Sequence, residues 1–287
     1  MTGQDESLRA EHRAMEEAFA GRCAELGLKL DPVLFWYHTL DLGESLITPG
    51  SFDYRSAISE YGLPQSMAGM QALDVGSATG FFSFEMERRG ADVTSVELPS
   101  LLSWDRFPGV STEQIITTIR GRLPYHTLQD FDEFIQTASH AAIYIALIDG
   151  PFQFCRSVLA SRITRRYAEI YDLPRLFGSS RRFDVVMLGD ILLHLIDPLR
   201  ALASAASICA GTLVIAQTIS HEGTPLMRWI ATPDDDTAEW WQPSLGWFRA
   251  ILQRLGFRSV DVVGQFHGRI RPGGESFNKT VIHARRD

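Results

Sequence analysis

Two kinds of hydrophobic pattern follow each other along this chain of 287 residues. Residues 6–28 repeat apolar positions at helical spacing, with Met15, Phe19 and Cys23 close to one face, which predicts an N-terminal helix. Residues 35–55 instead mix aromatic residues with glycine and proline, a composition typical of irregular but packed structure. We therefore expect residues 1–69 to form a helical extension that covers a site.

From Met70 onward, short apolar runs alternate with helical patterns. The run 72–75, a glycine turn, a helix over 81–89 and a second run over 92–96 predict a βαβ unit. Further strands are expected at 165–170, 183–188 and 212–217, with helices after Pro198 and over 245–255, and a terminal pair of strands at 259–263 and 280–284. Repeated alternation of this kind predicts a mostly parallel sheet with helices on both faces.

One stretch interrupts the alternation. Residues 99–161 are rich in aromatic residues and match neither a strand nor the expected crossover helix. We interpret them as an insertion within a domain that spans residues 70–287.

The charge, the cysteine spacing and the lengths of the apolar runs argue against several classes of protein. A net charge of -8 and 45% hydrophobic residues are typical of a globular protein and argue against broad binding to nucleic acid. Cys23, Cys155 and Cys209 are widely spaced and form no CxxC pair, so we expect neither disulfides nor a metal site. The N-terminus shows no secretory pattern and no run reaches membrane-spanning length, so a cytoplasmic location without membrane contact is expected, with the oligomeric state left open.

The strongest motif lies at the first strand-to-helix turn. The run Ala72-Leu73-Asp74-Val75-Gly76-Ser77-Ala78-Thr79-Gly80 places two glycines where a ligand can approach the backbone. Glu97 ends the next strand, where a carboxylate can accept hydrogen bonds from both hydroxyls of a ribose. The alternatives are a tight turn without a ligand, or a nicotinamide site, although Ala78 replaces the second glycine of the dinucleotide fingerprint.

This run resembles motif I of the class I S-adenosylmethionine-dependent methyltransferases. Three further segments, 36–50, Tyr171-Asp172-Leu173-Pro174 and 183–195, are similar to those of the tRNA wobble-uridine 5-oxyacetic acid methyltransferase-like family. The resemblance implies a Rossmann-like class I methyltransferase fold with a mostly parallel seven-stranded sheet, and S-adenosylmethionine as cofactor. It places around the cofactor Asp74, Gly76, Ser77 and Gly80 at the methionine end, Glu97 at the ribose, Tyr171 and Asp172 near adenine, and Leu188 and Gly189 beneath the methyl group.

Three residues are candidates for a catalytic base. Methyl transfer requires mainly alignment, but a hydroxyl or amine acceptor must also lose a proton, and histidine suits that role. His194, His38 and Asp190 lie in the matching segments. For each histidine the alternative is local packing or capping, and for Asp190 it is orientation of the substrate.

The acceptor is predicted from a tryptophan-rich region, whose Trp-Trp-x-Pro stretch also occurs in the resembled family, and from the insertion, where the chain departs most from that family. Trp229, Trp240, Trp241 and Trp247 surround an acidic run at 234–236, and aromatic residues in irregular loops line apolar ligand sites or pack the loop itself. Together with the insertion and the acidic charge, they favour a small organic acceptor methylated on oxygen or nitrogen. Modification of tRNA, by methyl or carboxymethyl transfer, and cofactor binding without catalysis are the alternatives.

Overall fold

The fold is built on one large twisted sheet. The computed structural model describes residues 3–122, 129–178, 182–231 and 239–286. Within these residues seven strands form the order β3-β2-β1-β4-β5-β9-β8, and β6 and β7 form a separate two-stranded ribbon. The strands are β1 (Gln71–Val75), β2 (Asp92–Glu97), β3 (Thr164–Tyr167), β4 (Phe183–Gly189), β5 (Cys209–Gln217), β6 (Met227–Trp229), β7 (Trp241–Pro243), β8 (Ser259–Arg269) and β9 (Ser276–Arg285).

Five neighbouring strands run parallel, and the last two close the sheet as a hairpin. The register joins Asp74 to Ser95 of β2 and to Met187 of β4. Strand β9 is antiparallel to both β5 and β8, which confirms the terminal strand pair predicted from the sequence. Because the strand order reverses between β1 and β4, the carboxyl ends of these two strands open a crevice where ligands of α/β folds bind.

Helices cover both faces because the strands alternate apolar side chains to the two sides. In β4, Val185 and Met187 pack in the core beneath α2, whereas Val186 and Leu188 pack with α8 and α9. The α-helices are α1 (Gly3–Glu25), α2 (Phe81–Arg88), α3 (Thr112–Arg122), α4 (Gln129–Thr137), α5 (His140–Tyr144), α6 (Gly150–Val158), α7 (Leu173–Phe177), α8 (Pro198–Ile208) and α9 (Leu245–Arg254). The predicted α/β class I methyltransferase architecture is therefore confirmed.

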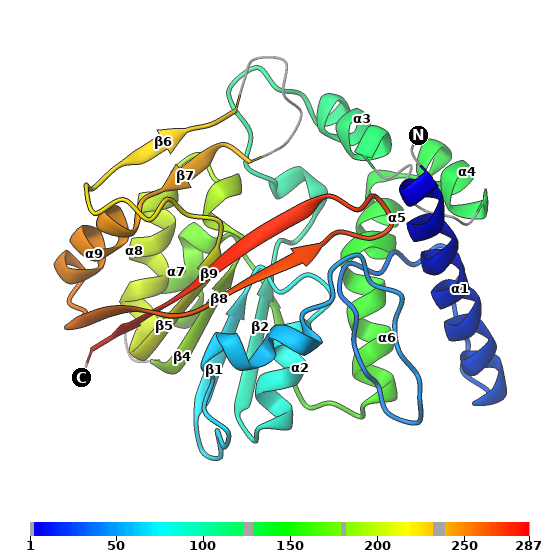
Figure 1. Cartoon of the computed structure of the whole chain (residues 1–287), viewed down its shortest axis with the longest axis horizontal. Helices are drawn as coiled ribbons and strands as arrows, with labels where there is room; N and C mark the ends of the chain where they lie inside the picture. The colour runs from blue at the N-terminus through cyan, green and yellow to red at the C-terminus, as the bar shows by residue number, and fades with distance from the viewer. Residues whose placement is uncertain (1–2, 123–128, 179–181, 232–238, 287) are drawn as a thin grey trace.

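The insertion is helical. It contains α3 to α6, with a π-helical turn, η3 (Ile145–Asp149), and a 3-10 turn, η2 (Leu101–Ser103), and it has a small core around Ile116, Ile135 and Ile143. Figure 1 shows α3 and the β6–β7 ribbon along the same upper side of the molecule, with α6 standing beside α1.

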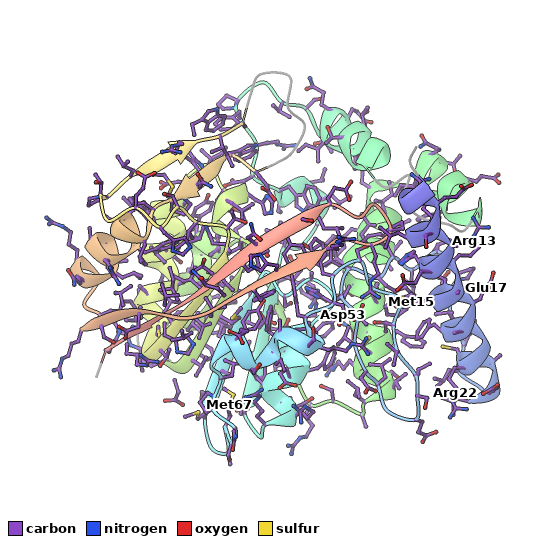
Figure 2. The ribbon with its side chains drawn as sticks, in the orientation of Figure 1. Arg13, Met15, Glu17, Arg22, Asp53 and Met67 are labelled. Atoms are coloured by element: carbon purple, nitrogen blue, oxygen red, sulfur yellow. The ribbon has the colours of Figure 1, made fainter. Side chains whose placement is uncertain are left out.

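The N-terminal residues pack against the rest of the domain rather than standing apart. Phe19 of α1 contacts Trp36 and Phe154, with ring centroids 5.0 and 5.9 Å apart. A second contact joins α1 to Arg271, which follows β8. The Arg271 guanidinium lies 3.0 Å from Met15 Sδ and 3.0 Å from Asp53 Oδ2, and Figure 2 labels Met15 and Asp53. Apart from a 3-10 turn, η1 (Arg55–Tyr61), the segment after α1 is irregular, as its glycine and proline content predicts.

Candidate functional site

The turn after β1 is shaped by glycine. Gly76 and Gly80 have φ angles of 69° and 93°, in the left-handed region that favours glycine. A Cβ atom at Gly76 would lie 2.8 Å from Ile191 Cδ1, and one at Gly80 would lie 2.8 Å from the Phe152 ring. Side chains therefore pack directly against both glycines, and Gly80 caps α2 without any side-chain hydrogen bond at the helix start. The N–H groups of residues 76–78 and Gly80 are already bonded, so the carboxylate of an amino acid would use the N–H groups in the first turn of α2.

A buried arginine supports this turn from below. Arg165 of β3 donates through Nη1 to the hydroxyls of Ser77 and Ser95, at 3.0 and 3.1 Å, and through Nη2 to the Ala78 carbonyl. Its guanidinium also lies 3.9 Å from the centroid of the Phe152 ring and forms an ion pair with Asp149 at 3.1 Å. Sequence reasoning placed Arg165 on a strand but missed this role, since nothing in the local pattern shows that the side chain points under the turn.

Two carboxylates lie at the strand ends beside the turn. Glu97 accepts hydrogen bonds from the Ala78 N–H at 2.7 Å and the Leu98 N–H at 2.8 Å, and is 8% exposed. Each oxygen keeps a further lone pair, so the two oxygens match the two hydroxyls of a ribose. Asp74 is buried and accepts from Ser83 Oγ at 2.6 Å. Burial raises its pKa to about 7, against the opposing effect of the Ser83 hydrogen bond. These carboxylate acceptors beside the glycine turn fit an adenosyl group that carries an amino acid.

Tyr171 and Asp172, the residues predicted to lie near adenine, are in a 3-10 turn, η4 (Ile170–Asp172). The strand before this turn, β3, ends at Tyr167, earlier than its predicted end at residue 170. The Tyr171 hydroxyl donates to Asp105 of the insertion and accepts from the Asp197 N–H at 3.3 Å. Asp172 instead forms an ion pair with Arg175 at 2.8 Å on the more exposed side. Tyr171 is thus fixed by the insertion, and the contact of either residue with adenine stays a prediction.

The end of β4 carries a buried ion pair. Leu188 packs in the core, and a Cβ at Gly189 would lie 3.2 Å from the Phe82 ring, so α2 closes tightly over this point. Asp190 follows with a φ angle of 50°. Its carboxylate accepts from Lys279 Nζ of β9 at 2.6 Å, and the lysine side chain is 6% exposed.

Two tyrosines of the irregular N-terminal segment face the same carboxylate. Burial, together with the nearby charge of Asp190, raises the pKa of both Tyr37 and Tyr54. The charge of Glu239 acts on Tyr37 from the other side. Lys279, Tyr37 and Tyr54 were missed by sequence reasoning, because only the fold brings them to Asp190.

The two candidate histidines have different environments. His38 is buried, and its ring Nδ1 lies 3.1 Å from Thr79 Oγ1. The backbone N–H of His38 donates to the same hydroxyl. Burial lowers its pKa to about 3, so the imidazole is neutral at physiological pH. His194 is partly buried and ends a 3-10 turn, η5 (Leu192–His194), instead of lying on the longer helix after Pro198. The residues Asp197 and Pro198 cap and start α8 only after this turn.

The β6–β7 ribbon is fastened over η5. The Trp240 N–H donates to the Leu193 carbonyl, and Trp241 Nε1 donates to the Leu195 carbonyl at 2.8 Å, so the ribbon holds both sides of His194. Phe107 of the insertion packs on Trp229 and Trp240, with ring centroids 5.6 and 4.8 Å apart.

The other tryptophan and the acidic run of that region lie elsewhere. Trp247 packs instead beside Phe248 on α9, against the core. The acidic run 234–236 lies outside the described residues.

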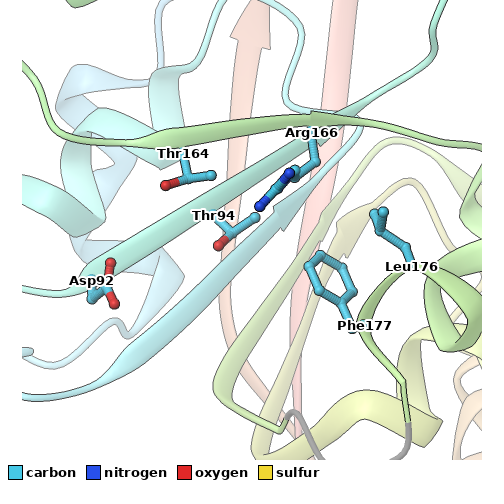
Figure 3. Close-up of a pocket in the computed structure, with 6 residues that line it drawn as sticks. All are labelled: Asp92, Thr94, Thr164, Arg166, Leu176 and Phe177. Carbon is cyan, nitrogen blue, oxygen red and sulfur yellow. The ribbon is translucent and has the colours of Figure 1, made fainter.

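Two surface cavities flank the sheet. The larger, of about 340 Å³, is bounded by Asp92, Thr164 and Phe177 and lies at the start of β2, the end opposite Glu97 (Figure 3). The smaller, of about 290 Å³, includes Lys279 among its lining residues and therefore adjoins the ion pair at the end of β4.

In the part of the chain that the structure describes, no three histidine, cysteine, aspartate or glutamate side chains gather as metal ligands. No described helix has the length and apolar character that crossing a bilayer requires. All three cysteines are buried thiols.

The chain belongs to a family of methyltransferase domains, whose model matches residues 53–262, more than half of the sequence. With the glycine turn, Glu97 and the sheet order, this makes the protein an S-adenosylmethionine-dependent methyltransferase. The cofactor supplies a methyl group on an activated sulfonium. The match begins at Asp53, so α1 lies outside it.

Comparison with other proteins adds distant similarities. No curated protein sequence matches the chain significantly. Among solved structures, the N-terminal domain of EvdMO1 with S-adenosylhomocysteine and D-fucose is 15% identical, with a TM-score of 0.47 over 94% of this chain and 95% of that one. Magnesium protoporphyrin IX methyltransferase (ChlM) from Synechocystis PCC 6803 with S-adenosylmethionine is 14% identical, with a TM-score of 0.41 over 81% and 77%. An O-methyltransferase family protein from Burkholderia thailandensis is 13% identical, with a TM-score of 0.48 over 82% and 56%.

Proposed function

We propose that this methyltransferase transfers the methyl group to an oxygen or nitrogen atom of a small organic acceptor. The observation that carries the proposal is the Asp190–Lys279 ion pair, with Tyr37 and Tyr54, directly after Gly189 at the end of β4. A hydroxyl or amine held there lies next to a carboxylate that can accept its proton, while the glycine turn and Glu97 hold the cofactor.

Lys279 orients Asp190 in this scheme. A lysine at 2.6 Å holds the carboxylate against β9, and Tyr54 of the N-terminal segment lies near it. His194, clamped beneath the aromatic ribbon, is the second candidate base, because it lies on the same side of the β4 end. His38 suits a positioning role, since its neutral ring binds Thr79 at the start of α2.

A tRNA acceptor, the expectation from the family resemblance, has less support. The net charge of -8 disfavours binding to a phosphate backbone, which normally requires a basic surface. The side chains that pack together over η5 are aromatic, namely Phe107, Trp229 and Trp241. Arg228 of the same ribbon is paired with Glu222.

The test is methyl transfer from labelled S-adenosylmethionine to a panel of small phenols, alcohols and amines, with bulk tRNA in parallel. Asp190→Asn should lower kcat/KM by about 100-fold, the usual effect of losing a general base. Cofactor affinity, measured by calorimetry, should stay close to that of the wild type, and Asp261→Asn, at an exposed carboxylate on β8, should change neither. Labelling of tRNA alone, or cofactor binding without turnover on any acceptor, would refute the proposal.

A further inference from the structure

The smaller cavity has a lining of unusual chemistry. It lies between the end of β5, the β7 strand and the β8–β9 hairpin, and its volume of about 290 Å³ is near the lower limit of small-molecule sites, roughly 300 Å³. It is lined by Thr218, Ile219, His221, Gln242, Gln265, Phe266, His267, Asn278, Lys279 and Thr280. Such a volume suits one small ring.

The polar groups of this lining are amides, hydroxyls, imidazoles and one ammonium. Among these residues there is no aspartate or glutamate, and the one lysine, Lys279, is already paired with Asp190 at 2.6 Å. A cationic ligand would find no carboxylate here, and an anion would have to compete with Asp190 for Lys279. Amides, hydroxyls and imidazoles each offer donors and acceptors, which is the pattern that a set of hydroxyl groups requires.

Some of these groups are already ordered by one another. Gln265 Nε2 lies 3.1 Å from His221 Nε2, and Thr280 Oγ1 lies 3.3 Å from the same nitrogen. Because an amide nitrogen can only donate, His221 Nε2 is the acceptor of the first contact. The cavity wall therefore presents fixed side chains instead of freely rotating ones, which lowers the entropic cost of binding.

A second observation points independently to a polar ligand. Gln217, the last residue of β5, is 1% exposed, and neither its Nε2 nor its Oε1 has a hydrogen-bond partner among the described residues. Gln217 lies directly opposite Thr280 in the antiparallel register, so the two side chains share one face of the sheet. A buried amide without partners costs stability, and retaining one is expected where a ligand completes its hydrogen bonds.

We propose that this cavity binds a neutral polyhydroxylated ring, of the kind found in a sugar, as part of the methyl acceptor. Gln265 and Thr280 contact its hydroxyls. Gln217 is not in the lining but lies beside Thr280, directly behind it, and it binds the hydroxyl that reaches past Thr280. Lys279 links the cavity to the transfer point, because it both lines the cavity and binds Asp190. This assignment of a substrate class rests on the proposed small-molecule function.

The experiment uses the full chain saturated with S-adenosylhomocysteine and saturation-transfer NMR. The ligands are methyl hexopyranosides of gluco, galacto and manno configuration and their 6-deoxy forms, beside a hexose 6-phosphate and a 2-amino-2-deoxyhexose. At least one neutral glycoside should bind, and more tightly than either charged sugar. Gln265→Ala and Gln217→Leu should each weaken that binding about tenfold or more, whereas Gln253→Ala, an exposed glutamine on α9, should leave it unchanged.

Gln217→Leu replaces an unpartnered amide by an apolar group of similar size, so it should fold and melt at a higher temperature while binding the sugar less tightly. A structural role alone would not give that combination. Absence of binding by every neutral glycoside, equal binding in the two variants and the wild type, or preference for a charged sugar would overturn the inference.

The experiments distinguish failure of the sugar site from failure of the proposed methyl transfer. Methyl transfer to an acceptor without hydroxyl groups, with no sugar binding, would refute the polyol site and leave small-molecule methylation standing. Sugar binding that depends on Gln265, without turnover of any acceptor, would support the site and refute the catalytic proposal.

Discussion

Single side chains at the strand ends owe their behaviour to what surrounds them. Glu97 accepts two main-chain N–H groups beside the glycine turn, whereas Asp74, on the neighbouring strand, is buried with one serine hydroxyl as its partner. A carboxylate with such donors is held in place, as the predicted contact with ribose hydroxyls requires, while a buried carboxylate with few donors retains its proton to higher pH. Two acidic residues of one motif thus have different roles.

Glu97→Ala should weaken binding of S-adenosylmethionine. It removes two hydrogen bonds to a charged acceptor, each worth roughly 1.5–3 kcal/mol, so we expect a loss of at least about 100-fold in affinity by calorimetry. Glu11→Ala, at an exposed position on α1, is the matched control and should bind as the wild type does. Unchanged affinity in Glu97→Ala would remove this residue from the cofactor site.

Asp74→Asn should change how stability depends on pH. Burial raises the folded-state pKa of Asp74 from 3.8 to about 7, so between these values the folded state keeps a proton that the unfolded state has released. The contribution of Asp74 is therefore present below the unfolded pKa and is lost as pH rises through the folded pKa. Relative to Asp74→Asn, the wild type should lose up to about 4 kcal/mol of unfolding free energy across this window. Urea denaturation of both proteins at several pH values measures it, and parallel pH profiles would contradict it.

At the level of elements, the glycine turn depends on parts of the chain far from it in sequence. Arg165 connects β3 to the turn through Ser77 and Ala78, and to the insertion through Asp149 and Phe152. The insertion therefore helps to shape the cofactor site, in addition to any contact with the acceptor.

Arg165→Met should destabilise the protein and loosen the turn. It leaves Asp149 without its buried cation, and breaking such a pair typically costs about 3–5 kcal/mol. We expect a lower urea midpoint together with weaker cofactor binding. Arg166→Met, at the adjacent exposed arginine of β3, should show neither effect. Equal stability of the two variants would show that Arg165 contributes no more than a surface residue.

On the scale of the whole molecule, residues before β1 complete the core. Trp36, Leu40, Tyr54 and Tyr61 are buried in the same cluster as Phe82 of α2, and α1 adds Phe19 and Cys23 to it. An extension that shares a core with the domain is expected to unfold together with it.

Phe19→Ala should test this coupling. Removing a phenyl ring that is 3% exposed and packed on Trp36 should lower the unfolding free energy by about 3–5 kcal/mol. Tryptophan fluorescence and far-UV circular dichroism should still give one coincident transition. Glu17→Ala, on the exposed side of α1, should be near neutral. A small effect of Phe19→Ala, or separate transitions, would show that α1 docks independently.

Much of the architecture was predictable because it follows from local periodicity. The βαβ unit around Gly76 and the strands β4 and β5 were placed within a few residues, since each has a clear apolar pattern. The terminal hairpin was predicted too, but its strands are longer than expected, because β8 continues to Arg269 and β9 begins at Ser276. The ends of β3 and the 3-10 turn at His194 were misplaced, because short elements are fixed by tertiary contacts such as those of Tyr171 with Asp105.

The sequence by itself determined the sheet, the glycine turn and the acidic residue at the end of β2, because these depend on spacing along one segment. Only the tertiary structure decided which side chains meet there. Lys279 is 89 residues from Asp190, and Arg165 is 88 residues from Ser77, so their contacts exist only once the strands take their order in the sheet. Burial, which shifts the pKa values of Asp74 and His38, is likewise a property of the packed molecule and not of the local sequence.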